Sequence, residues 1–141
     1  GWRLLEPYEE GARREPQLQE GRGQLLKDCR HDGIAIGLLT RNAHRSVNVL
    51  CRKYDIGFDA VVTREFGLMK PHPGPILHIL QTWGVAADRA LMVGDYVDDV
   101  RCGKAAGTRT CFFQNDGFPN YGDEADYTVA STAELRRVIW K

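Results

Sequence analysis

Four residues from three separate segments have side chains that could together bind a phosphate group. Thr40 ends a short apolar run and supplies a hydroxyl group, and Lys70 lies in a proline-rich segment and supplies an ammonium group. Asp95 and Asp99 follow another apolar run and supply carboxylates. Mg²⁺ usually takes one or two protein carboxylates and completes its ligands with waters and phosphate oxygens. A hydroxyl, an ammonium and a magnesium-binding carboxylate around one point would form a phosphate site.

Each of these residues also has an ordinary structural explanation. A threonine at the end of a strand often only caps the next helix, and a lysine before a proline is usually solvated. Asp98, beside Asp99, is placed to interact favourably with a helix dipole. Asn42 adds an amide to the loop after Thr40, at the start of a predicted helix, where free backbone N–H groups favour an anion. The joint order and spacing of these residues favour the functional interpretation.

Apolar and amphipathic segments alternate from residue 34 onward, which predicts the elements that position these side chains. The predicted strands span residues 34–40, 58–63, 90–94 and 108–113, with a short edge strand at 126–130. The predicted helices span residues 43–55, 76–84, 98–106 and 132–140. Such alternation predicts right-handed βαβ units and a parallel, doubly wound sheet. Functional groups in such sheets lie beyond the carboxyl ends of the strands, here at residues 40–42, 63 and 94–95.

The first 33 residues differ from the rest. They are charged and predicted to be helical, with no strand of their own. Leu18, Leu25 and Leu26 indicate a helix that leads into the first predicted strand, with a turn at Asp32-Gly33.

Composition excludes several classes of protein. Nineteen basic and nineteen acidic side chains cancel, which argues against a nucleic-acid binder that works by bulk charge. No apolar run approaches the length of about 18 residues that a membrane span needs, and the N-terminus does not resemble a signal peptide. The four cysteines form no C-x-x-C pair and the histidines no ligand spacing, so a zinc site is not expected. We expect reduced thiols, in the cytoplasm or another reducing compartment.

Three segments resemble motifs of a known family. LLTRN at residues 38–42, KPHPGPILHIL at 70–80 and VGDYVDDVRCGKAAG at 93–107 are similar to the second, third and fourth motifs of haloacid dehalogenase-like hydrolases, which are mostly Mg²⁺-dependent phosphatases. The resemblance runs from about residue 16 to the C-terminus, and its GD-x-x-x-D pattern is specific. It implies a three-layer α/β fold with a Rossmann-like parallel sheet.

The resemblance also implies roles for individual residues. It assigns substrate binding to Thr40, Arg41, Asn42 and Lys70. Among these, Thr40 would hydrogen-bond the transferred phosphoryl group, and Lys70 would balance charge on the nucleophile and the phosphate. Asp95 would bind Mg²⁺ directly or through water, and Asp99 would complete and support this metal site.

One motif of the family is missing. The first motif, D-x-D-x-[TV], supplies the nucleophilic aspartate and the acid/base aspartate at the end of the first strand, yet no D-x-D occurs in these 141 residues. We therefore expect residues 1–20 to be the remnant of a helical cap, and residues 21–141 to form a core domain without its first strand. Two inner strand edges would then face a gap, which a partner or a missing N-terminal segment would cover. Residues 2–5 are an alternative occupant of this gap.

Two functions remain open. The first is a phosphatase-type hydrolase that acts on a small phosphorylated metabolite through an aspartyl-phosphate, for which this chain would be inactive alone. The second is a non-catalytic binding or regulatory module of the same fold. A phosphoacceptor receiver domain is disfavoured because its acids precede its lysine, whereas here Thr40 and Lys70 precede the acids. A dinucleotide-binding enzyme is disfavoured because no G-x-G-x-x-G follows a strand.

Overall fold

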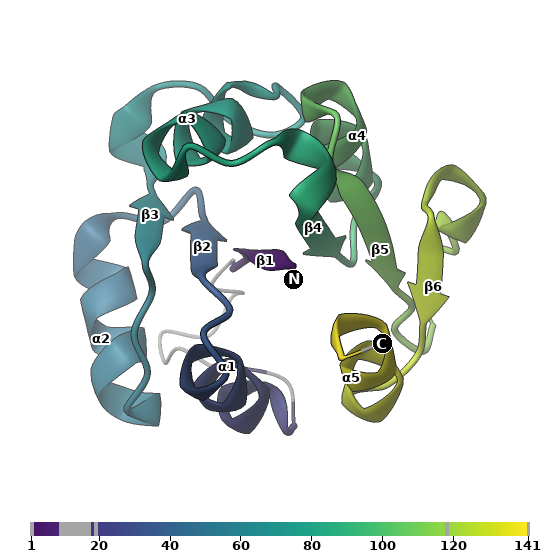
Figure 1. Ribbon diagram of the computed structural model, residues 1–141, viewed down its shortest axis with the longest axis horizontal. Helices are drawn as coiled ribbons and strands as arrows, with labels where there is room; N and C mark the ends of the chain where they lie inside the picture. The colour runs from purple at the N-terminus through teal and green to yellow at the C-terminus, as the bar shows by residue number, and fades with distance from the viewer. Residues whose placement is uncertain (1, 9–17, 19, 118, 141) are drawn as a thin grey trace.

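The computed structural model of this chain describes residues 2–8, 18, 20–117 and 119–140. Within these ranges the strands form one parallel sheet in the order β3-β2-β1-β4-β5-β6 (Figure 1). The strands are β1 (Arg3–Pro7), β2 (Ile36–Leu39), β3 (Ala60–Val62), β4 (Ala90–Gly94), β5 (Arg109–Phe113) and β6 (Tyr127–Val129). The predicted parallel, doubly wound α/β fold is confirmed.

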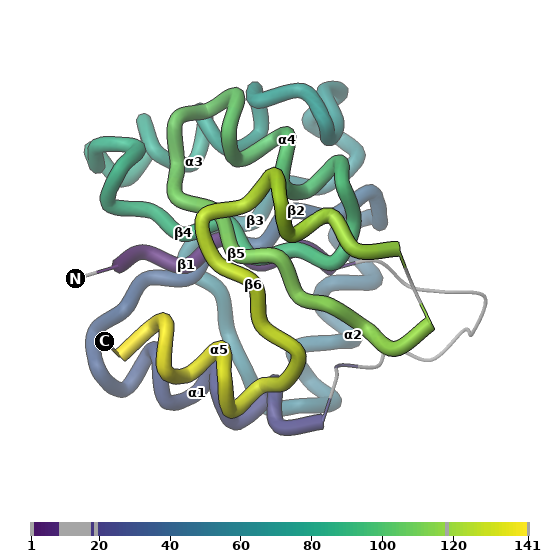
Figure 2. Tube along the Cα trace, turned by 90° about the vertical axis from the view of Figure 1, so that its right-hand side faces the viewer, coloured from purple at the N-terminus to yellow at the C-terminus, as the bar shows by residue number. Residues whose placement is uncertain are grey.

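Helices cover both faces of the sheet. They are α1 (Arg22–His31), α2 (His44–Tyr54), α3 (Gly74–Trp83), α4 (Val97–Ala106) and α5 (Thr132–Ile139). The tube in Figure 2 shows α3 and α4 on one face and α1, α2 and α5 on the other. Single 3₁₀ turns η1 (Arg64–Phe66), η2 (Ala87–Arg89) and η3 (Gly122–Glu124) lie in the connections. No helix within the described ranges has the length and apolarity to cross a bilayer.

Burial on two faces explains the continuous apolar runs of the central strands. Every residue of β2 and of β4 is buried, as expected for strands covered by helices on both sides. Helices α3 and α4 end at left-handed glycines where the sequence indicated, with Gly84 at φ 66° after α3 and Gly107 at φ 85° after α4. Glycine adopts this conformation without the steric penalty of a Cβ.

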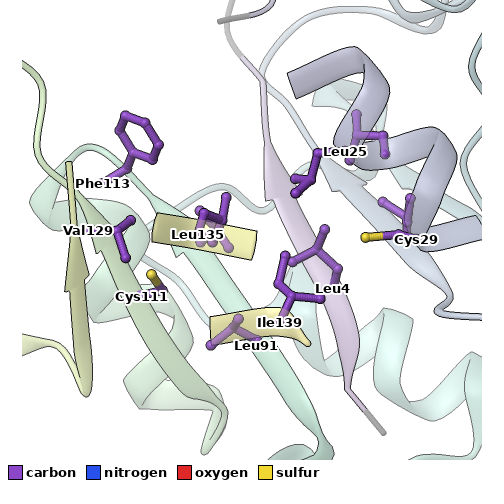
Figure 3. Packing of buried hydrophobic residues seen from close by; sticks show 12 residues of the cluster. Leu4, Leu25, Cys29, Leu91, Cys111, Phe113, Val129, Leu135 and Ile139 are labelled. Carbon is purple, nitrogen blue, oxygen red and sulfur yellow. The ribbon is translucent and has the colours of Figure 1, made fainter. Parts of the chain in front are cut away.

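Two apolar layers flank the sheet. On one face, Leu25 and Cys29 of α1 and Leu135 and Ile139 of α5 pack against strand residues such as Leu4 (Figure 3). The opposite layer joins α3 and α4 to the sheet, and its buried members are Leu5, Leu39, Val62, Ile76, Ile79, Leu80, Ala90, Met92, Cys102 and Ala106. Leu4 and Leu5, which are adjacent in sequence, therefore serve opposite layers, as strand geometry requires.

β1 corrects the expectation that the sheet lacks its central strand. Its residues 4–7 pair with β2 and its residues 3–5 pair with β4. The predicted gap between two unpaired inner edges is therefore wrong. The alternative, in which residues 2–5 fill this place, agrees with the structure for residues 3–5, and the strand extends further, to Pro7. The strand was not predicted because it is short and contains an acid. Its strand conformation depends on pairing with β2 and β4, which the sequence pattern does not show. The expected cap remnant falls mostly on residues 9–17 and 19, which lie outside the described residues.

The four cysteines are free thiols, and burial predicts a different reactivity for one of them. Cys29, Cys102 and Cys111 are fully buried, and burial raises the pKa of each thiol to about 12. Cys51 is only half-buried, with a pKa that burial also raises. The thiolate is the reactive form of cysteine. A rise of the thiol pKa from 9.0 to about 12 reduces the thiolate population at pH 8 roughly a thousand-fold.

We therefore expect a disulfide reagent such as Ellman's to modify Cys51 first in the folded protein. About one equivalent should react quickly, and all four thiols should react in guanidinium chloride. Cys51→Ser should abolish the fast phase. A fast phase of the same amplitude in that variant would show that one of the other thiols is accessible.

Candidate functional site

The carboxyl ends of β1, β2 and β4 meet where the strand order reverses. β1 lies between β2 and β4, and the chain proceeds outward from it in both directions (Figure 1). Doubly wound sheets bind ligands at such a switch point, beyond the carboxyl ends of the strands. Thr40 directly follows β2 and Asp95 directly follows β4, so the topology places both predicted residues at this edge.

Thr40 is held in a tight turn after β2. Its backbone N–H donates to the carbonyl of Val62 in β3 at 3.0 Å, which ties the turn to the neighbouring strand. Its hydroxyl donates to Oδ1 of Asn42 at 2.9 Å and accepts the backbone N–H of Asn42 at the same distance. The side chain is buried at the sheet edge. Asn42 therefore fixes the orientation of the Thr40 hydroxyl, as a neighbour in the predicted loop.

Lys70 and Asp99 form a buried ion pair that joins the turn before α3 to the start of α4. Nζ of Lys70 donates to Oδ1 of Asp99 at 2.8 Å, and the two side chains are only 6% and 3% exposed. The second oxygen of Asp99 accepts the backbone N–H groups of Asp95 and Tyr96, both at 3.2 Å. Asp99 thus fixes both the ammonium group and the backbone turn that carries Asp95.

Asp95 is half-buried at the end of β4. Its Oδ2 accepts a hydrogen bond from the amide of Asn115 at 3.2 Å. Burial, and then the neighbouring charge of Asp99, raise the pKa of Asp95 above its ordinary value. Burial disfavours the charged form of this carboxyl, and the nearby negative charge of Asp99 acts in the same direction.

Arg41 and Asp98 form a second, looser pair at the rim of the site. Nη2 of Arg41 lies 3.6 Å from Oδ2 of Asp98, and the side chains are 51% and 42% exposed. Exposed pairs of this kind contribute little stability. Asp98, which the sequence suggested only as a helix-dipole residue, therefore also lies beside the guanidinium group of Arg41.

Sequence reasoning missed a buried acid–base pair beneath the site. Glu6 of β1 and Arg22, the first residue of α1, are 3% and 6% exposed and hydrogen-bonded to each other. Burial raises the pKa of Glu6 more than Arg22 lowers it, and the charges of Asp95 and Asp99 raise it further. Glu6 therefore lies close enough to the two aspartates to interact with them. A single acid directly after the apolar pair Leu4-Leu5 was the available signal.

Asn115 was also missed, because it lies in the segment after β5 that was predicted to be a plain polar loop. Its position just beyond the carboxyl end of a strand that neighbours β4 could have indicated it. By contrast, Glu6 could not be identified as the partner of Arg22 without knowing the position of β1.

A shallow pocket opens beside Thr40 and Lys70 at the carboxyl ends of β2 and β3. It encloses about 220 Å³ of empty space, including the part open to solvent. Its lining residues are Leu39, Thr40, Arg41, Val62, Leu68, Met69, Lys70 and Pro75. Three of the four predicted substrate-binding residues, all except Asn42, therefore line one pocket.

Asp95 is the described residue that best fits a magnesium ligand. Among the described residues, no three His, Cys, Asp or Glu side chains are grouped closely enough to hold a metal ion by themselves. Mg²⁺ nevertheless needs only one or two protein carboxylates when waters and phosphate oxygens complete its coordination. Burial is the main cause of the raised pKa of Asp95, and the negative charge of Asp99, which a cation would offset, adds to it. Direct metal binding by Asp99, whose oxygens already accept three hydrogen bonds, stays a prediction.

The fold and this edge define a doubly wound α/β domain with charged residues at its topological switch point, and known proteins resemble this chain in sequence and in fold. The family model for haloacid dehalogenase-like hydrolases matches residues 3–113. A haloacid dehalogenase-like hydrolase domain-containing protein of Arabidopsis thaliana is 30% identical over 98% of this chain and 59% of its own length. A phosphoglycolate phosphatase of Nitrosococcus oceani is 26% identical, covering 96% of this chain and 63% of its own length.

A solved structure is also similar to this chain. The crystal structure of a haloacid dehalogenase phosphatase from Thermococcus onnurineus superposes with a TM-score of 0.76 and 27% identity, covering 87% of this chain and 58% of that one. The chain therefore belongs to the haloacid dehalogenase-like hydrolase family, and it spans about three fifths of the length of these relatives. Of these relatives, the Nitrosococcus and Thermococcus proteins are named as phosphatases.

Proposed function

We propose that this chain provides the phosphate- and metal-binding face of a hydrolase that acts on a small phosphate monoester. The buried pair between Lys70 and Asp99 is the observation that supports this most strongly. A lysine is rarely so buried unless it is paired, and this one lies at the switch-point edge, beside the pocket that Thr40 also lines. A purely structural ion pair would not need that location.

In this proposal each residue contributes one interaction with the phosphate. The Thr40 hydroxyl donates to a phosphate oxygen in place of the Asn42 amide oxygen that it now contacts. Lys70 supplies positive charge, and Asp99 keeps its ammonium group in position. Asp95 holds Mg²⁺, which neutralises charge on the phosphoryl group. Asn115 orients Asp95 through its hydrogen bond.

We further propose that this chain alone hydrolyses a phosphate ester very slowly. No D-x-D occurs in the sequence, and the carboxyl end of β1 carries Glu6, Pro7 and Tyr8. Glu6 is buried and bonded to Arg22, so it is not presented to a substrate as a nucleophile. By analogy with other catalytic groups that act as a unit, losing the nucleophile lowers kcat on the order of 10⁶-fold.

The second candidate is a non-catalytic binding or regulatory module. It is favoured by the same observation, namely that the carboxyl end of β1 offers no nucleophilic aspartate. Both candidates bind phosphate with Mg²⁺, but only the first hydrolyses an ester. Phosphate release from a generic ester by the chain, dependent on Mg²⁺ and abolished by Asp95→Asn, would select the hydrolase. Tight binding without any release would select the module.

Asp95→Asn is expected to weaken Mg²⁺ binding by at least about tenfold, because the variant loses the charge of the proposed ligand. Isothermal titration calorimetry with Mg²⁺ in the presence of inorganic phosphate measures this directly. Asp98→Asn is the matched control, since Asp98 lies three residues away and contacts Arg41 at the surface. Its Mg²⁺ affinity should change less than about twofold. Unchanged affinity in Asp95→Asn would refute the metal assignment.

A further inference from the structure

The contact between Arg41 and Asp98 joins the two sides of the site. Arg41 lies in the loop after β2, and Asp98 lies in the first turn of α4, which follows β4. Because β1 separates β2 from β4 in the sheet (Figure 1), this contact connects segments on either side of the carboxyl end of β1. A phosphate ester bound between Thr40 and Asp95 would therefore lie close to this pair.

Arg41 is placed to meet an anion beside the phosphate. It lines the same pocket as Thr40 and Lys70. That pocket has room for only about one water molecule, so it does not enclose the organic group of an ester, and this group must lie at the exposed rim. Arg41 belongs to that rim, because its side chain is 51% exposed.

Two other cations of the site are buried and closely paired. Lys70 donates to Asp99 and is 6% exposed, and Arg22 is hydrogen-bonded to Glu6 and 7% exposed. Turning either cation toward a ligand would leave a buried carboxylate without its partner, which is costly. Arg41, by contrast, lies 3.6 Å from its partner, beyond the usual N–H···O distance of about 2.7–3.2 Å. An incoming anion can therefore replace that partner at small cost.

We propose that Arg41 recognises a second anionic group, a carboxylate or a phosphate, on the organic part of the substrate. This group takes the place of Asp98 beside the guanidinium group, whose planar fork of N–H donors matches both kinds of anion. The inference rests on the proposed function, because it places the phosphoryl group at Thr40, one residue before Arg41. It narrows the substrate from any small phosphate monoester to one that carries a second negative charge near the ester.

Two matched pairs of ligands test this proposal in the presence of excess Mg²⁺. Phosphoglycolate is compared with its neutral amide, and ethylene glycol bisphosphate with ethylene glycol monophosphate, while inorganic phosphate reports on the phosphate site alone. In at least one pair, calorimetry or NMR titration should show the ligand with the second charge binding about fivefold more tightly, as expected for one exposed charge–charge contact. The pair with the larger ratio of affinities identifies the second group as a carboxylate or a phosphate.

Three substitutions test whether this preference comes from Arg41. Arg41→Gln should reduce the ratio of affinities within the pair to about one. Arg64→Gln is the matched control and should leave the ratio unchanged, because Arg64 is an exposed arginine that follows β3 but does not line the pocket. Asp98→Asn removes the competing carboxylate, so it should raise the ratio by about twofold.

Each outcome bears on one of the two proposals. Equal affinities within both ligand pairs, or binding of inorganic phosphate without any ester, would overturn the role of Arg41 while the phosphate site stands. A ratio that persists in Arg41→Gln, is lost equally in Arg64→Gln or does not rise in Asp98→Asn would also overturn it. Failure of inorganic phosphate and of all four esters to bind would overturn the proposed function itself.

Discussion

Replacing Asp99 with alanine should lower the free energy of unfolding by about 3–5 kcal/mol. The substitution leaves the ammonium group of Lys70 buried without its carboxylate, and it removes the acceptor of the backbone N–H groups of Asp95 and Tyr96. Breaking a buried pair from one side is costly because the remaining charge has lost its hydration as well. Urea denaturation of the variant and the parent chain measures the difference.

Two further variants separate charge from hydrogen bonding. Asp99→Asn keeps an acceptor for the two backbone N–H groups but removes the negative charge, so it should cost less than alanine. Adding Lys70→Met to Asp99→Ala removes the stranded ammonium group, and the double variant should be more stable than the sum of the single effects predicts, by about 1–3 kcal/mol. Strict additivity would show that the ion pair contributes nothing beyond its separate groups.

Asp98→Ala is the surface control for this experiment. Asp98 precedes Asp99 and is also paired, but its partner Arg41 is 51% exposed and 3.6 Å away. Exposed pairs contribute about 0–1 kcal/mol, so this variant should be nearly as stable as the parent. The contrast between adjacent aspartates would attribute the loss in Asp99→Ala to burial and not to the general charge of the helix start.

The parts of the fold that sequence reasoning predicted are those with a local cause. β4 has the bounds expected for it, residues 90–94, because an apolar run between polar segments is readable without knowing its neighbours. Glycine ends α3 and α4 where a left-handed residue is needed. The placement of Thr40 and Asp95 at one edge followed from strand polarity alone.

The parts that were missed depend on contacts between distant segments. β1 is a strand because β2 and β4 both pair with it, and its own five residues carry too weak a pattern to show this. Glu6 and Arg22 are 16 residues apart, and Asn115 and Asp95 are 20 apart. No periodicity links such positions, so only the tertiary structure can show which polar groups meet.

Gly94→Ala should disrupt the site from within the sheet. A Cβ on residue 94 would lie 2.1 Å from Cβ of Asp99 and 2.7 Å from its Oδ2, far inside van der Waals contact. Asp99 cannot move aside without giving up Lys70 and the two backbone N–H groups that it accepts. Overpacking a rigid site costs typically 1–3 kcal/mol, and we expect a loss of about 3 kcal/mol here, measured by urea denaturation.

Gly23→Ala provides the matched control, with an effect of opposite sign. Gly23 lies in α1, where an added Cβ would make an ordinary contact of 3.4 Å with Tyr54. Alanine is favoured over glycine in helices by up to about 1 kcal/mol, so this variant should be as stable as the parent or slightly more stable. Because Asp99 also fixes the turn that carries Asp95, Gly94→Ala should weaken Mg²⁺ binding as well, whereas Gly23→Ala should not. A stable Gly94→Ala variant with normal Mg²⁺ affinity would show that α4 does not hold Asp99 against β4, and the geometry proposed for the site would then be wrong.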